Sequence, residues 1–164
     1  MLNEEILYNK IILLSRNKLF YTKFNLKDIF QNRIHLIFIH ISFLFIKIKQ
    51  SKNQKKYSNF YQKTFDLIFS RIELDMREMG FGDTTLNKNM RFLVKAFYDI
   101  LLNCENYRKK NDNLKSIFLE KYLYTNVKNP KNTGLINYFN KYAAFCFDLG
   151  LDSVLEGELN FKYK

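Results

Sequence analysis

The sequence of 164 residues contains no tryptophan, one proline, five glycines and two cysteines. So few turn-forming residues argue against a sandwich or barrel of many short strands, and they favour long helices joined by few loops. Hydrophobic residues make up 47% of the chain and aromatic residues 17%, so intrinsic disorder is excluded for most of it. The two cysteines, Cys104 and Cys146, are isolated in the sequence, and we expect both to be small residues of the core.

Motifs for nucleotide binding, metal binding and nucleophilic catalysis are also missing. The sequence has no GxxxxGK[ST] and no GxSxG, and Thr85 stands where a dinucleotide loop starting at Gly80 needs its third glycine. His35 and His40 lie about 140° apart on a helix, so they cannot chelate one metal ion from one face. Either could be a haem ligand in principle, but a histidine on a polar stripe or facing a partner is favoured. We therefore expect no enzyme, no metal and no cofactor.

Long hydrophobic runs are absent too. The most apolar segment, residues 34–46, has 13 residues, whereas a bilayer span needs roughly 20, so a buried helix is the better interpretation. The acidic pair Glu4 and Glu5 differs from the basic start of a signal or transit peptide. These features predict a cytoplasmic protein with, at most, a peripheral attraction to the membrane.

Negative charge is scarce in the first third of the chain. The net charge is +11, and residues 1–58 hold 11 Lys/Arg against 3 Asp/Glu, whereas residues 59–164 hold 16 against 13. A predicted basic loop over about residues 47–58 carries Lys47, Lys49, Lys52, Lys55 and Lys56. Such a cluster attracts anionic lipid headgroups or RNA phosphates. The alternative is a solvated loop that reflects codon bias in an AT-rich genome, and the sequence leaves both interpretations open.

The spacing of apolar residues predicts an all-α, single-domain bundle of about six helices over residues 1–164. The expected helical segments are about 3–15, 18–24, 28–49, 59–79, 83–107, 114–124 and 135–149. The segment 28–49 is also rich in Ile and Phe, which suits a strand. Its polar residues recur in two lines of seven-residue steps, which leaves apolar surface on two sides, as expected of a central helix. Asp28 and Asp83 stand where helices need N-terminal caps.

Residues 76–83, Met-Arg-Glu-Met-Gly-Phe-Gly-Asp, form a motif that we call the elbow: the end of one amphipathic helix, a glycine turn and the start of another helix. Gly80 stands where a helix C-terminus needs a left-handed residue. The structural part of the elbow comprises Gly80, Gly82 and Asp83. Arg77 and Glu78 either make local ion pairs in a helix joint or contact a partner, and both interpretations stay open.

At the elbow the sequence resembles the ubiquinol–cytochrome c chaperone family, assembly factors for the respiratory ubiquinol–cytochrome c reductase. The family pattern is an acidic residue with Leu or Met, then Arg-Glu, then Gly-x-Gly-Asp, followed by a helix carrying Lys, Met and Phe-Tyr. The matching residues are Asp75, Met76, Arg77, Glu78, Gly80, Gly82, Asp83, Lys88, Met90, Phe97 and Tyr98. Weaker similarities extend over nearly the whole chain. One departure is Asp99-Ile100, where bacterial members often have Gly-Arg.

The resemblance implies a bacterial, non-enzymatic chaperone that helps newly made cytochrome b mature and assemble into the reductase. It implies cytochrome b or another reductase subunit as the partner. The basic first third of the chain, and not the resemblance, suggests peripheral contact with the cytoplasmic face of the inner membrane or with the ribosome, and no DNA partner is expected. Arg77, Glu78 and Lys88 are the candidate partner-binding residues. The alternative is a basic helical protein that binds RNA or the ribosome and has no role in respiration.

Overall fold

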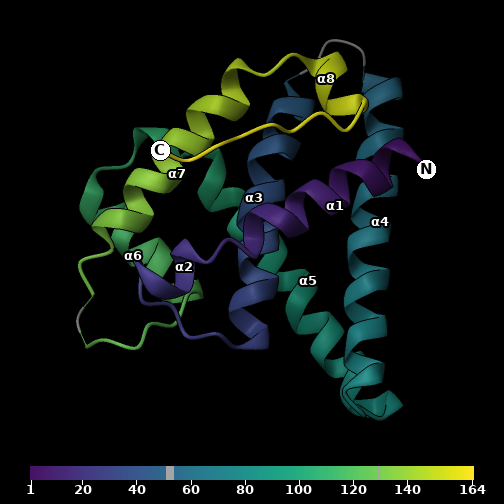
Figure 1. The fold of residues 1–164 in the computed structure, drawn as a ribbon. Helices are drawn as coiled ribbons and strands as arrows, with labels where there is room; N and C mark the ends of the chain where they lie inside the picture. Colours follow the sequence, from purple (N-terminus) through teal and green to yellow (C-terminus); the bar gives the residue numbers. More distant parts are fainter. Residues whose placement is uncertain (51–53, 129) are drawn as a thin grey trace.

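The computed structural model describes residues 1–50, 54–128 and 130–164 (Figure 1). Its helices are α1 (Asn3–Ser15), α2 (Leu19–Thr22), α3 (Phe30–Lys49), α4 (Gln54–Glu78), α5 (Asp83–Glu105), the 3-10 turn η1 (Tyr107–Lys109), α6 (Asp112–Tyr122), α7 (Thr133–Asp148) and α8 (Leu151–Leu155). Within the described residues there is no strand, and six helices have eleven residues or more. The expected all-α bundle of about six helices is confirmed.

The central element is α3, which packs against α1, α4, α5 and α7 (Figure 1). Fourteen of its 20 residues are buried, because apolar side chains point to both sides of the helix. This confirms the expectation of a central helix rather than a strand. In the part of the chain that is described, no helix has the length and hydrophobicity needed to cross a membrane. The hydrophobic run 34–46 therefore belongs to the core of the bundle.

The two histidines of α3 do not face solvent or a partner, which corrects the favoured interpretation of the sequence. His35 is 4% exposed and its Nδ1 lies 2.6 Å from the carbonyl oxygen of Tyr122. His40 is fully buried, with Nδ1 2.6 Å from the Leu36 carbonyl oxygen and Nε2 2.8 Å from Tyr138 Oη. Because both ring nitrogens of His40 are engaged, neither is free to bind haem. Polar partners from other helices make these buried positions tolerable.

The predicted basic loop is largely helical. Lys47 and Lys49 belong to the last turn of α3, and α4 begins at Gln54, so that Lys55 and Lys56 extend from its first turn. Lys52 lies outside the described residues. The helix extends this far because Tyr57 and Phe60 are buried, 9% and 7% exposed, and anchor the start of α4 in the core. The start of α4 is thus determined by two buried aromatic side chains within a lysine-rich segment.

Capping by Asp28 and Asp83, which the sequence predicts, does not occur. The N-cap residues of α3 and α5 are Ile29 and Gly82, and neither helix start has a side-chain cap. Asp28 instead forms an ion pair of 2.6 Å with Arg33. The carboxylate of Asp28 therefore pairs with an arginine instead of accepting a hydrogen bond from the backbone. Asp83 pairs with Arg77 in the same way.

Both cysteines are confirmed as core residues. Cys104 of α5 is 3% exposed and Cys146 of α7 is 1% exposed. Burial raises the pKa of both thiols, that of Cys146 to about 12. Such thiols stay protonated at neutral pH, so they pack as small hydrophobic side chains.

Candidate functional site

The elbow joins α4 to α5 through a glycine turn. Gly80 has φ +92°, its N–H donates to the Arg77 carbonyl at 3.0 Å, and the Phe81 N–H donates to the Met76 carbonyl at 3.2 Å. These two bonds form the Schellman motif, which ends a helix with a left-handed residue. The expected role of Gly80 is thus confirmed. Gly82 has φ −74° and is extended, so its backbone is open to any residue.

Arg77 links the two helices across this turn. Its Nη2 lies 3.1 Å from Glu73 Oε1 on α4, and its Nη1 lies 2.9 Å from Asp83 Oδ1 in the first turn of α5. These two carboxylates raise the pKa of the Arg77 guanidinium. All three side chains are substantially exposed, so the pairs position the joint more than they stabilise it.

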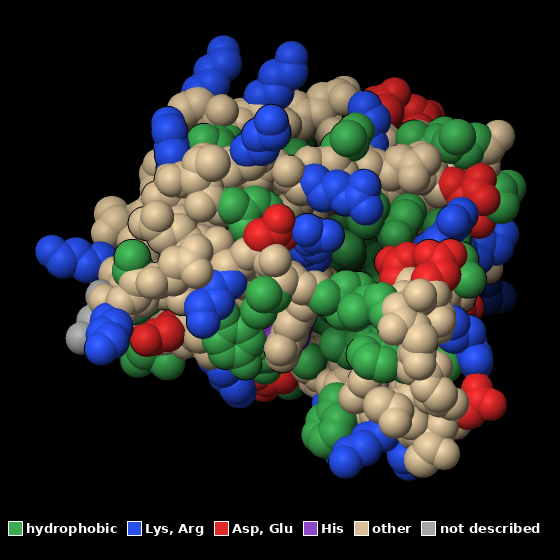
Figure 2. Space-filling view, turned by 60° about the horizontal axis from the view of Figure 1, so that its bottom comes forward, with side chains coloured by type: hydrophobic (Ala, Val, Ile, Leu, Met, Phe, Trp, Pro, Cys, Tyr) green, Lys and Arg blue, Asp and Glu red, His purple; other side chains and the backbone are tan. Residues whose placement is uncertain are grey.

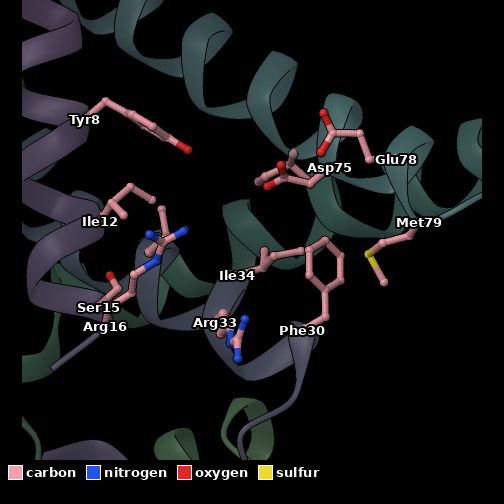
Figure 3. Close-up of a pocket in the computed structure, with 12 residues that line it drawn as sticks. Tyr8, Ile12, Ser15, Arg16, Phe30, Arg33, Ile34, Asp75, Glu78 and Met79 are labelled. Atoms are coloured by element: carbon pink, nitrogen blue, oxygen red, sulfur yellow. The ribbon is translucent and has the colours of Figure 1, made fainter. Parts of the chain in front are cut away.

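Beside the elbow, α1, α3 and α4 enclose a pocket of about 340 Å³, which we call the α1/α3/α4 groove (Figure 3). Its apolar lining consists of Tyr8, Ile12, Phe30, Ile34, Ile37, Ile72 and Met79. Ile34 and Ile72 are buried at its base, whereas Met79 is 53% exposed at the end nearest the elbow. On the face in Figure 2, hydrophobic side chains gather near the centre among acidic and basic ones. The groove offers an apolar surface that no described part of the chain covers.

The two edges of the groove carry opposite charge. Arg16 and Arg33 come from α1 and α3, and Asp75 and Glu78 come from α4 (Figure 3). Arg33 is paired with Asp28, whereas Asp75 and Glu78 have no ion pair within the described residues. The α4 edge therefore has two carboxylates available for a basic group on a ligand.

The pKa of Tyr8 on α1 is affected by a carboxylate of the α4 edge. Burial raises the pKa of its hydroxyl, and the nearby carboxylate of Asp75 raises it further. The guanidinium of Arg71 lies 6.0 Å from the ring centroid of Tyr8. Tyr8 therefore stays neutral and offers a hydroxyl group at the apolar wall of the groove.

Lys88 lies away from the groove, on the outer face of α5. It is exposed together with Arg91 and Lys95, which follow at i+3 and i+7 and so share its face of the helix. None of the three has an ion pair in the described part of the chain. The structure thus separates the three candidate residues: Arg77 is in the joint, Glu78 is on the groove and Lys88 is on a basic stripe.

The sequence did not predict the groove itself. Tyr8, Phe30 and Ile34 are part of hydrophobic patterns that indicate only burial, and their convergence depends on how the helices pack. Within the described residues, no group of three or more His, Cys, Asp or Glu side chains is arranged to hold a metal ion.

Comparison with known proteins agrees with the elbow motif. The family model described as ubiquinol-cytochrome C chaperone matches residues 22–161. The crystal structure of the Cbp3 homolog from Brucella abortus is similar to this chain, with a TM-score of 0.79 and 20% sequence identity over 98% of this chain and 91% of that chain. At this identity the likeness shows the shared fold. A search of curated proteins found no match. The chain belongs to the ubiquinol–cytochrome c chaperone family.

Proposed function

We propose that this chaperone binds newly made cytochrome b and keeps it competent for assembly into ubiquinol–cytochrome c reductase. Membership of the family supports a chaperone role in assembly of that complex, and hence a non-enzymatic one. The observation that carries the proposal is the α1/α3/α4 groove, whose apolar lining lies between edges of opposite charge. A membrane protein awaiting insertion or cofactors has apolar segments flanked by charged loops, and such a segment matches this groove.

Site-specific crosslinking tests the groove directly. A photoreactive amino acid at Met79, which is 53% exposed in the groove, is expected to form a covalent adduct with cytochrome b in cells. The matched control is the same amino acid at Leu102, which is 60% exposed on α5 and outside the groove. Equal yields of cytochrome b adduct at both positions would contradict binding in the groove.

Charge reversal tests the α4 edge. D75K/E78K removes both available carboxylates, and we expect a lower yield of assembled reductase without loss of folding. E120K/E158K changes the net charge equally at exposed carboxylates outside the groove that have no ion pair in the described chain, and should leave assembly unchanged. The same decrease for both variants would show that only net charge matters.

Deletion tests the function as a whole. Cells lacking the chain should lose cytochrome b haem absorbance and assembled reductase, whereas proteins outside the respiratory chain keep their levels. Normal levels of both would refute the proposal, whatever the groove binds.

A second candidate function is contact with ribosomal RNA, favoured by the stripe Lys88, Arg91 and Lys95. Cations in a row, without carboxylates to neutralise them, attract the phosphates of a nucleic-acid strand in a salt-dependent way. K88E/R91E should weaken co-sedimentation with ribosomes at low salt. An RNA-binding protein with no respiratory role would, in contrast, impair translation in general when deleted.

A further inference from the structure

A second pocket of about 300 Å³ lies at the end of the bundle where α3, α5 and α7 finish. Its apolar lining consists of Phe43, Ile46, Cys104, Ala143 and Phe147. Lys47 of α3 and the η1 residues Arg108 and Lys109 supply three cations around it. The carboxylate in the lining, Glu105, lies 3.5 Å from Lys49 Nζ and is thus neutralised by a fourth cation. We call this the cationic pocket.

Phe147 stands at the mouth of the cationic pocket. Its side chain is 53% exposed, and the guanidinium of Arg108 and the ammonium of Lys47 lie 4.7 and 5.3 Å from its ring centroid. Lys47 also donates a hydrogen bond to the carbonyl of Phe147, at the C-terminal end of α7. Half-exposed aromatic rings next to basic side chains are typical of protein surfaces that meet the headgroup layer of a membrane.

A further pocket is connected to the cationic pocket through Lys49, which pairs with Glu105 of the cationic pocket. It is lined by Ile48, Lys49, Tyr57, Ser58 and Tyr61. Tyrosine combines an apolar ring with a hydroxyl group and is enriched where one part of a side chain is apolar and the other is wet. Lys55 and Lys56 are exposed on the adjoining first turns of α4. This end of the molecule therefore combines cations, aromatic rings and apolar hollows.

We propose that the cationic pocket binds the headgroup of an anionic phospholipid and so holds the chaperone at a membrane surface. Arg108 and Lys109 bind the phosphate, and the apolar lining contacts the glycerol and the first acyl carbons. The pairing of a charged rim with an apolar lining matches an amphiphile better than a nucleic acid. A base would need a free aromatic face to stack on, and Arg108 and Lys47 already lie over Phe147.

Vesicle binding measures this interaction without cytochrome b, so its result is independent of the proposed function. The protein should co-sediment with vesicles of phosphatidylcholine and phosphatidylglycerol and not with phosphatidylcholine alone. R108E/K109E should weaken that binding about tenfold or more, because two cations become two anions. The control K18E/K23E makes the same change of charge on exposed lysines around α2, which packs near the opposite end of α7. If both variants weakened vesicle binding equally, the proposed lipid site would be refuted, and the binding would depend only on long-range charge.

A fluorescent reporter tests insertion separately from charge. The chain has no tryptophan, so F147W places a single indole at the mouth of the pocket. Phosphatidylglycerol vesicles should shift its emission to the blue, and glycerol phosphate at the same concentration should not. F92W is the control, because Phe92 is 60% exposed on α5 and lies about 18 Å along that helix from the pocket residue Cys104. No shift for F147W, an equal shift for F92W, or a shift of F147W with glycerol phosphate alone would each refute the lipid site.

Discussion

Arg77 donates from Nη1 to Asp83 Oδ1 at 2.9 Å and thereby joins the last turn of α4 to the first turn of α5. Because this pair is exposed, its contribution to stability should be small and screened by salt. A double-mutant cycle with R77Q and D83N, followed by urea unfolding, should show a favourable coupling free energy at low salt that vanishes in concentrated NaCl. A coupling that survives high salt would contradict the interpretation of this pair as a solvent-screened surface ion pair.

Glu78 and Lys88 are better probes of partner binding than Arg77, which holds the joint between α4 and α5. Neither has an ion pair within the described residues, so E78K and K88E should leave the unfolding temperature unchanged. Each should lower the amount of reductase assembled in cells, measured on native gels. R77E serves as the comparison, because it breaks the joint itself. If E78K and K88E both assemble reductase at the wild-type level, neither Glu78 on the groove nor Lys88 on the basic stripe contacts a partner that assembly needs.

The two glycines of the elbow should respond differently to alanine. Gly80 has φ +92°, and a Cβ there would meet no atom within 4 Å, so the cost of G80A is conformational, about 1 kcal/mol. Gly82 has an equally open surrounding but φ −74°, so G82A should lower the free energy of unfolding by less. Urea denaturation measures both. A larger loss for G82A would contradict the assignment of the turn.

Gly157 combines a positive φ with a close approach to α1. Its φ is +74°, and a Cβ would lie 2.8 Å from Ile6 Cγ2 and 3.1 Å from the Asn3 carbonyl oxygen. G157A should therefore destabilise the protein by about 2 kcal/mol and loosen the C-terminal tail. The control is G150A, because the nearest atom to its Cβ is 3.7 Å away and its φ is negative. Thermal unfolding of the two variants should differ clearly.

Buried His40 predicts a loss of stability in mild acid. Burial lowers its pKa to about 4 in the folded chain, whereas the unfolded value is 6.5. Above pH 6.5 the ring is neutral in both states; below it the unfolded chain takes up a proton that the folded chain does not. The free energy of unfolding should thus fall by about 2 kcal/mol between about pH 7 and pH 5. Urea titrations at the two pH values should show a smaller decrease in the free energy of unfolding for H40Q than for the wild type. An equal decrease in both proteins would refute the assignment of this pH dependence to His40. The pKa of His35 is also lowered, which destabilises both the wild type and H40Q in mild acid.

The sequence predicted those features that depend on neighbours along the chain. The spacing of apolar residues indicated the six long helices and the central position of α3, because helix periodicity decides which side chains share a face. A left-handed residue at Gly80 followed from the need to end α4, and only glycine takes that conformation without strain. The same local motif identified the family.

Tertiary structure decided the features that depend on residues far apart in the sequence. It buried His40 against Tyr138, 98 residues away, and assembled the α1/α3/α4 groove from three helices. The pairs of Asp28 and Asp83 with arginines five and six residues away are local, but helix periodicity and capping preferences do not predict them. Helix packing decides which distant side chains come together, and a one-dimensional pattern does not specify which partner that is.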